Sequence, residues 1–149
     1  MKEKKSMTHE CRFCDLLKSY PTNPAFIAEF DHSVALLNYN QDSYLGQSLL
    51  ILKDHYTHLH LTPIALQQNI VPEMAILTKA LLKAFGGFRA NHESLGNSAA
   101  HVHWHIVPRY LGDLNAGGPP IHSQSPRKLT GEEYQALAAR IHKELTEDL

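Results

Sequence analysis

The sequence predicts a single α+β domain with an antiparallel sheet of about five strands, one long helix and a C-terminal helix. The 149 residues are enough for one domain with a single core. Short apolar or alternating runs, typical of strands, lie in two groups along the chain. Each group is followed by a segment with apolar residues at three- and four-residue steps, which indicates a helix. Strands and helices in this order favour an antiparallel sheet covered by helices.

Five segments have the length and composition of strands, and a short helix or turn precedes them at residues 14–20. The first two are separated by Asp31-His32, which suits a tight turn, so we expect them to form a hairpin. The third is a nearly continuous apolar run, which predicts a strand covered on both faces. The five predicted strands are residues 25–30, 33–38, 47–53, 88–93 and 101–110.

Two segments predict helices. The first begins with Thr62 as N-cap and Pro63 as first helical residue, and Gly86-Gly87 ends it. Its apolar face consists of Ile70, Met74, Leu77, Leu81 and Phe85. A long loop rich in Gly, Pro and Ser follows the fifth strand, and Thr130 and Glu133 then form a capping-box pattern. The apolar face of this closing helix consists of Tyr134, Leu137, Ile141 and Leu145.

The charge balance argues against two classes of partner. With 14 basic and 15 acidic side chains the formal net charge is −1, so we expect neither nucleic-acid binding nor membrane association. No apolar run is long enough to span a bilayer, and no secretory signal is visible at the N-terminus. We therefore expect a flexible tail at residues 1–9, a single domain over residues 10–149, and a cytoplasmic location.

Three alternating histidines are the most informative feature. On a strand, His101, His103 and His105 share one face, with neighbours on that face about 7 Å apart. One metal ion can bridge two neighbouring imidazoles but would be strained in binding all three, so we expect the histidines to divide their roles. The alternative is a solvated strand face, although histidine is not favoured there. Arg109, just after Pro108, is expected to be an exposed solubilising charge.

The two cysteines, Cys11 and Cys14, are separated by two residues. In a secreted chain such a pair would form a disulfide. In a reducing compartment the same spacing indicates half of a metal site or a redox pair. The spacing alone leaves these alternatives open.

The sequence resembles the histidine triad family of nucleotidyl hydrolases and transferases. The likeness rests on four segments in order: CRFC at residues 11–14, LLILKDH at 49–55, LGNSAA at 95–100 and HVHWHIVPRY at 101–110. Bacterial members described as diadenosine polyphosphate hydrolase-like are the most similar branch. The resemblance implies an antiparallel α+β fold and a two-fold homodimer with the long helix in its interface. The helix stripe alone is equally consistent with an internal core.

The resemblance assigns His103 as the nucleophile that attacks the α-phosphorus, with its other ring nitrogen donating to a backbone carbonyl. His105 would contact the phosphate. Ser98 would donate to the leaving group, although a local turn-stabilising hydroxyl is an equal alternative. Further contacts to substrate are implied for Asn38, Asn91, Asn97 and Ala99.

The same resemblance gives His101 a different role. With Cys11, Cys14 and His55 it would complete a closed, structural zinc site, and no catalytic metal is implied. His58 and His60 are alternative ligands, ranked as surface residues. At the nucleoside end, Asn38 would hold the ribose, with Tyr39 and Asn40 as shifted alternatives. The base would pack near Phe13 and Leu36.

The leading hypothesis is a hydrolase or transferase acting at the α-phosphate of a dinucleoside polyphosphate or phosphoramidate, with adenine nucleotides favoured. It would work through a nucleotidyl-histidine intermediate and release a nucleoside monophosphate. A second hypothesis is a nucleotide-binding protein with negligible catalysis, used for sensing or partner recognition. A third is a protein in which the triad itself binds a transition metal. The base, the leaving group and the acceptor are left open by the sequence.

Overall fold

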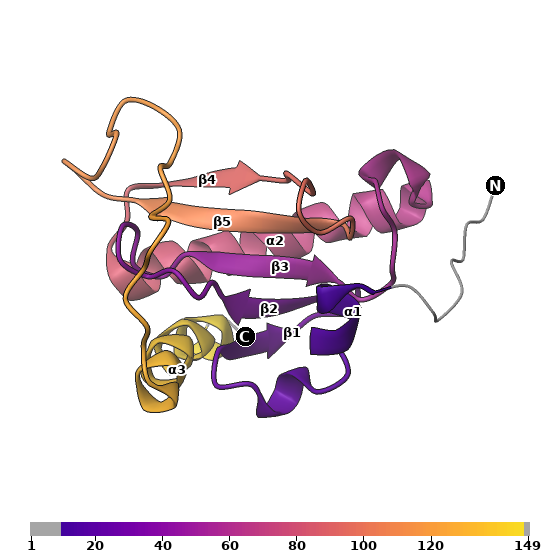
Figure 1. Cartoon of the computed structure of the whole chain (residues 1–149), viewed down its shortest axis with the longest axis horizontal. Coiled ribbons are helices and arrows are strands. Elements are labelled where there is room, and N and C mark those ends of the chain that lie inside the picture. The colour runs from indigo at the N-terminus through magenta and orange to yellow at the C-terminus, as the bar shows by residue number, and fades with distance from the viewer. Residues whose placement is uncertain (1–9, 148–149) are drawn as a thin grey trace.

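The computed structural model describes residues 10–147, so the predicted tail at residues 1–9 lies outside the described part. Five strands form one antiparallel sheet in the order β1-β2-β3-β5-β4 (Figure 1). This confirms the predicted fold class and the predicted β1–β2 hairpin. The strands are β1 (Phe26–Glu29), β2 (Ser33–Leu37), β3 (Ser48–Leu52), β4 (Arg89–Glu93) and β5 (His103–Arg109).

One face of the sheet is covered by helix α2 (Ile64–Phe85), with helix α3 (Gly131–Glu147) packed beside it. Leu77 and Leu81 of α2 and Ile141 of α3 are fully buried in one core cluster, which also includes Trp104 and Ile106 of β5. Burial of each such aliphatic side chain contributes about 2 kcal/mol. The apolar stripes of both predicted helices therefore belong to the core of the chain itself.

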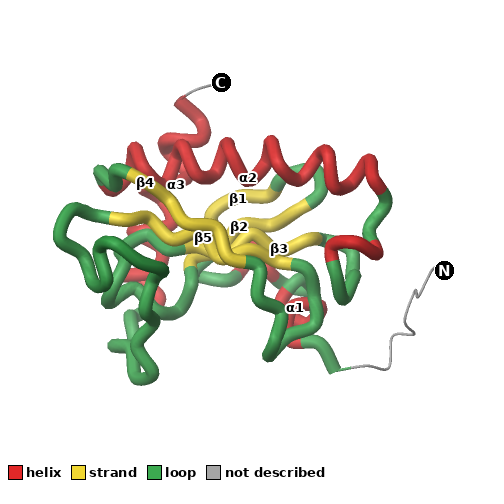
Figure 2. Tube along the Cα trace, turned by 90° about the horizontal axis from the view of Figure 1, so that it is seen from above, coloured by secondary structure: helices red, strands yellow, loops and turns green. Residues whose placement is uncertain are grey.

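The opposite face carries the short helix α1 (Arg12–Leu16), as Figure 2 shows. Phe13 of α1 is buried against Val34 and Leu36 of β2 and Ile51 of β3. This second, smaller cluster holds α1 over the middle of the sheet. Two 3-10 turns complete the fold, η1 (Tyr20–Thr22) and η2 (Leu59–Leu61). No helix within residues 10–147 is long and apolar enough to cross a membrane.

The predicted helix ends are correct except at one point. Gly86 ends α2 in the left-handed conformation, with φ of 74°. Thr130 and Glu133 form the predicted capping box, with Thr130 N donating to Glu133 Oε2 at 2.7 Å. The prediction of Thr62 as N-cap is wrong, because Pro63 occupies that position and the Thr62 hydroxyl donates to Leu59 O instead.

Arg109 is buried rather than exposed, which corrects the expectation from the sequence. Only 4% of its surface is accessible. Its Nε and Nη2 donate to the two carboxylate oxygens of Asp113 at 2.8 and 2.9 Å, and Nη1 donates to Gly118 O at 2.7 Å. The guanidinium lies over the Tyr44 ring. These contacts hold the start of the long β5–α3 loop against the sheet.

Replacing Arg109 with methionine is expected to destabilise the fold by about 3–5 kcal/mol, since Asp113 would keep a buried, unpaired charge. Urea denaturation measures the change. Lys128→Met, at an exposed position of the β5–α3 loop, is the matched control and should cost less than about 0.5 kcal/mol. Equal stability of the two variants would show that the Arg109–Asp113 pair does not anchor the loop.

Candidate active site and metal centre

Strand β5 brings the predicted site residues to one face of the sheet. Alternation along the strand places His103, His105 and Arg109 on the face that carries α1, while Trp104 and Ile106 enter the core under α2. His101 lies just before the strand begins. The predicted separation of the histidine face from the apolar face is therefore confirmed.

The hydrogen bonding of His103 suits a nucleophile. Its Nδ1 lies 2.6 Å from the His101 carbonyl oxygen and donates to it, so the lone pair is on Nε2. Phe13 packs against the ring, with 4.5 Å between ring centroids. Burial lowers the pKa of His103 below the ordinary imidazole value, although the hydrogen bond to His101 opposes this. The imidazole is therefore neutral at neutral pH, with its lone pair on Nε2.

His105 is fixed in the opposite tautomer by Asn38. The Asn38 side chain accepts from Asn40 N through Oδ1 at 3.0 Å, which directs its Nδ2 to His105 Nδ1 at 3.2 Å. Because Nδ1 accepts this bond, the proton of His105 is on Nε2. Burial, with a smaller contribution from His103, lowers the pKa of His105 to about 4. His105 is therefore a neutral hydrogen-bond donor.

The loop before β5 carries three of the predicted residues. Ala99 is buried in the Phe13 cluster, whereas Asn97 and Ser98 are exposed. Ser98 Oγ accepts from Arg12 Nη2 at 3.4 Å. Arg12 was not predicted from the sequence, and its guanidinium lies 5.0 Å from the Phe13 ring centroid. Its position between the two cysteines could have indicated that it lies near the triad, since a metal site that joins Cys11 to His101 brings α1 to the triad.

Two of the three asparagines predicted to contact substrate, Asn91 and Asn38, have partners within the protein. Asn91 on β4 accepts from Arg109 Nη1 at 2.7 Å, so it belongs to the network that holds the β5–α3 loop. Asn38 is buried against His105, as described above. Nothing in these contacts tests a role in substrate binding, and for both residues that role stays a prediction.

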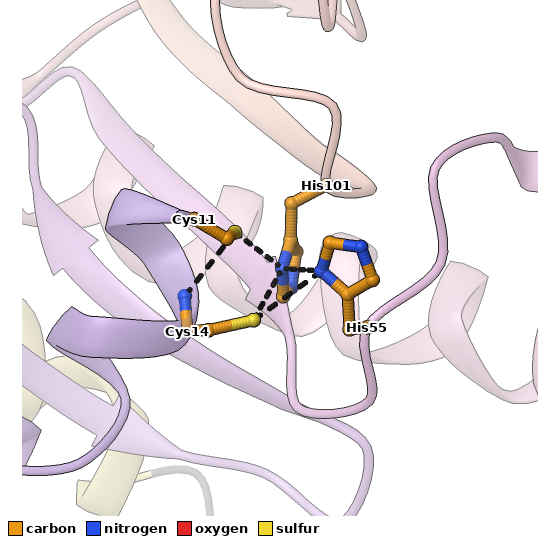
Figure 3. A group of neighbouring side chains, drawn as sticks. All are labelled: Cys11, Cys14, His55 and His101. Carbon is orange, nitrogen blue, oxygen red and sulfur yellow. Dashed lines mark hydrogen bonds between the residues drawn. The ribbon is translucent and has the colours of Figure 1, made fainter. Parts of the chain in front are cut away.

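The four predicted metal ligands come together at the start of β5. Cys11 and Cys14 belong to α1 and its N-cap, His55 follows β3, and His101 precedes β5 (Figure 3). Their ligand atoms all lie within 4.8 Å of one another. Sequence positions more than forty residues apart are thus combined in one cluster that could hold a metal ion.

The distances and the donor set fit zinc. His55 Nδ1 and His101 Nδ1 are 3.1 Å apart, and sulfur–nitrogen distances are 3.3 Å from Cys14 to His55 and 3.5 Å from Cys11 to His101. The edges of a zinc tetrahedron with two sulfur and two nitrogen ligands are about 3.3–3.8 Å. His101 Nε2 donates to Leu52 O at 2.7 Å, which leaves Nδ1 as the ligand atom.

A cation would also explain two neighbouring thiols in this position. Without one, burial raises the pKa of the Cys14 thiol to about 11, with a further contribution from Cys11. A bound divalent ion reverses this effect by stabilising the thiolates. The alternative ligands His58 and His60 are exposed and pack against each other, outside the cluster.

Comparison with known proteins places this site in a family. A model of the HIT domain matches residues 22–112. The chain belongs to the HIT family. It is 28% identical over 113 residues to the adenylylsulfatase HINT3 of Arabidopsis thaliana, covering 72% of this chain but only 56% of the plant protein. It is 30% identical over 108 residues to a HIT-like protein of Methanocaldococcus jannaschii, covering 69% of this chain and 81% of that protein.

Solved structures agree on the HIT fold. The crystal structure of a zinc-bound histidine triad family protein from Mycobacterium smegmatis superimposes with a TM-score of 0.70 at 21% identity. The match covers 93% of this chain and 94% of that protein. The five-stranded sheet and its helices are therefore those of the HIT family.

Proposed function

We propose that this HIT protein is a nucleotidyl hydrolase or transferase that cleaves substrates at the α-phosphorus through a nucleotidyl-His103 intermediate. The observation that carries the proposal is the hydrogen bond from His103 Nδ1 to His101 O, which leaves Nε2 as a neutral nucleophile. The relation to an adenylylsulfatase supports a nucleotidyl substrate.

The reaction has two displacement steps. His103 Nε2 attacks the α-phosphorus, a phosphorus–nitrogen bond forms, and the leaving group departs with the electron pair of the broken bond. Water or another acceptor then attacks the same phosphorus, and the electron pair of the phosphorus–nitrogen bond returns to Nε2. With water, the proton lost by the attacking oxygen leaves for solvent and a nucleoside monophosphate is released.

Two neighbours of His103 stabilise the charge that develops on the phosphate. His105 donates from Nε2, and its tautomer is set in advance by Asn38. Arg12 would supply a positive charge beside Ser98, whose hydroxyl would interact with the leaving group. Asn38 or Asn40 would contact the ribose. Phe13 and Leu36, predicted near the base, are buried in the cluster that holds α1 and present little surface to it. We favour adenine nucleotides because the HINT3 relative is an adenylylsulfatase.

We further propose that Cys11, Cys14, His55 and His101 hold one zinc ion in the cytoplasm, where the thiols stay reduced. With four protein ligands the ion would be structural and would supply no open coordination position. Through His101 it would fix the loop whose carbonyl orients His103.

The test is the intact mass of the protein after brief mixing with adenosine 5′-phosphoramidate or a dinucleoside polyphosphate. The quench is alkaline, because a phosphorus–nitrogen bond to histidine is labile in acid. A nucleotidyl adduct on wild-type protein, absent from His103→Ala, is the expected result. Nucleotide binding without an adduct and without monophosphate release would favour the binding protein with negligible catalysis.

The pH dependence of turnover follows from the two lowered pKa values. Protonation of His103 removes the nucleophile, and its pKa lies below the ordinary value of about 6.5. We expect kcat/KM to stay level from pH 8 to about pH 6.5 and to fall only in more acidic solution. Metal content is measured in parallel. A midpoint at or above pH 7 would show that neutral His103 is not the attacking group.

We also propose a homodimer built on β4 and α2. Strand β4 is an edge strand, paired only with β5 within the described residues. Beside it lies an apolar groove of about 580 Å³ between α2 and His92, lined by Val71, Met74 and Leu82. Val71 is 61% exposed. A second copy would cover this groove and pair with the free strand edge.

Val71→Glu is therefore expected to shift the protein from dimer to monomer, because a carboxylate would be buried in the apolar interface. Sedimentation equilibrium measures the change, which should be at least about 100-fold in the dimer dissociation constant. Ala136→Glu, at an exposed position of α3, is the control and should leave the dimer intact. An unchanged dimer in Val71→Glu would place the interface elsewhere.

A further inference from the structure

A fourth histidine lies beside the triad and is not part of it. His122, in the loop between β5 and α3, has its ring centroid 6.3 Å from that of His105. The ring centroids of His105 and His103 are 5.2 Å apart. Three imidazoles therefore follow one another across the site, beginning at the nucleophile.

The position of His122 is fixed by the residues on both sides of it. Ile121 N donates to the Tyr44 hydroxyl at 2.9 Å, and Asn40 Nδ2 donates to Ser123 O at 3.3 Å. Tyr44 is fully buried, and its ring meets the His122 ring edge-on, with 6.2 Å between centroids. The fold therefore holds this part of the loop, and His122 with it, against the site.

The carboxylate of Glu93 is the charged group that His122 faces. Glu93 lies on β4 directly opposite His105. Its Oε1 is buried, and the described residues supply no hydrogen bond to it. His122 Nε2 approaches this oxygen at 3.5 Å. A lone carboxylate at this place would repel an anionic substrate, whereas an N–H directed at this carboxylate from His122 Nε2 reduces the repulsion.

We propose that His122 binds the leaving group of substrates in which that group is itself an oxyanion, a second phosphate or a sulfate. This inference rests on the function proposed above. When the bond to the α-phosphorus breaks, its electron pair stays on the leaving oxygen, so negative charge grows on that group. With Nε2 facing Glu93, Nδ1 is the ring nitrogen left for the oxyanion, and the imidazolium form donates from both nitrogens. An amine leaving group carries no such charge and gains nothing from His122.

Binding measurements test the proposal without requiring turnover. Calorimetry compares AMP with α,β-methylene-ADP, whose second phosphate occupies the place of the leaving group and which is not hydrolysed there. We expect His122→Ala to weaken the binding of α,β-methylene-ADP by about 10–100-fold and the binding of AMP by less than about twofold. The control His60→Ala removes an exposed histidine of η2 and should change neither affinity. Equal weakening of both ligands, or of neither, would overturn the proposal.

Turnover separates this inference from the function on which it rests. With adenosine 5′-phosphosulfate, His122→Ala should lose about 10–100-fold in kcat/KM. With adenosine 5′-phosphoramidate it should lose less than about twofold. Equal losses on both substrates would refute leaving-group recognition while leaving catalysis by His103 intact. If wild-type protein turns over neither substrate, the proposed catalysis fails, and the affinity ratio of the two nucleotides still decides the role of His122.

Discussion

Replacement of His103 by alanine is expected to reduce kcat/KM by about 10⁴-fold or more, equivalent to roughly 5.5 kcal/mol of activation free energy. The reason is chemical, because alanine offers no atom that can form a bond to phosphorus. Release of nucleoside monophosphate from adenosine 5′-phosphoramidate measures the loss. The fold should survive, since the substitution removes one buried side chain and its hydrogen bond to His101 O. We expect a cost of about 1–3 kcal/mol in stability.

The matched control is His60→Ala, an exposed histidine in η2 that should keep wild-type turnover. A second comparison is His103→Gln, which can donate to a carbonyl but cannot attack as an imidazole does. It should be as inactive as His103→Ala and more stable. Substantial turnover in either His103 variant would exclude the proposed intermediate and require a nucleophile elsewhere.

The sequence predicted the parts of the molecule that depend on local periodicity. Alternation in HVHWHIVPRY separates the histidine face from the core face, and the structure confirms this. The 3.6-residue period of the apolar residues located both helices, and the Gly86 signal located the end of α2. These features depend only on residues that are close together along the chain, so they can be predicted from the sequence alone.

The features that the sequence could not predict depend on contacts between distant segments. Arg109 has the appearance of a surface charge until the Gly- and Pro-rich loop folds back and places Asp113 and Gly118 on it. Asn38 was assigned to the ribose, but its contact with His105 is visible only once β2, β3 and β5 are adjacent. His122 lies in a loop with no periodic pattern, so only the fold brings it to His105.

The metal ligands were predicted through the family resemblance, since the spacing of Cys11 and Cys14 alone also allows a disulfide or a redox pair and does not identify His55 or His101. The structure adds a connection between the cluster of potential metal ligands and His103, the proposed nucleophile. His101 contributes Nδ1 to the cluster, donates from Nε2 to Leu52 O, and accepts the His103 Nδ1 proton at its carbonyl oxygen. One residue therefore links the proposed zinc site to the orientation of the proposed nucleophile.

Substitution of Cys14 by serine is accordingly expected to affect stability and activity together. Metal content should fall from about one zinc per chain to near zero, since a hydroxyl is a poor zinc ligand. Losing the ion releases α1 from His55 and His101. We expect this to lower the free energy of unfolding by about 3–5 kcal/mol, or Tm by roughly 10 °C. Turnover should fall about 10–100-fold, because His101 no longer holds the His103 ring in place. Elemental analysis, thermal unfolding and kinetics measure the three effects.

Two comparisons make this prediction decisive. His58→Ala removes an exposed histidine outside the cluster and should keep the metal, the Tm and the activity. His103→Ala should lose activity but keep the metal. The opposite pattern, with metal retained in Cys14→Ser and lost in His103→Ala, would mean that the triad itself binds the ion. Metal loss that lowers Tm without slowing turnover would separate the two roles of His101, because its carbonyl would then orient His103 without help from the ion.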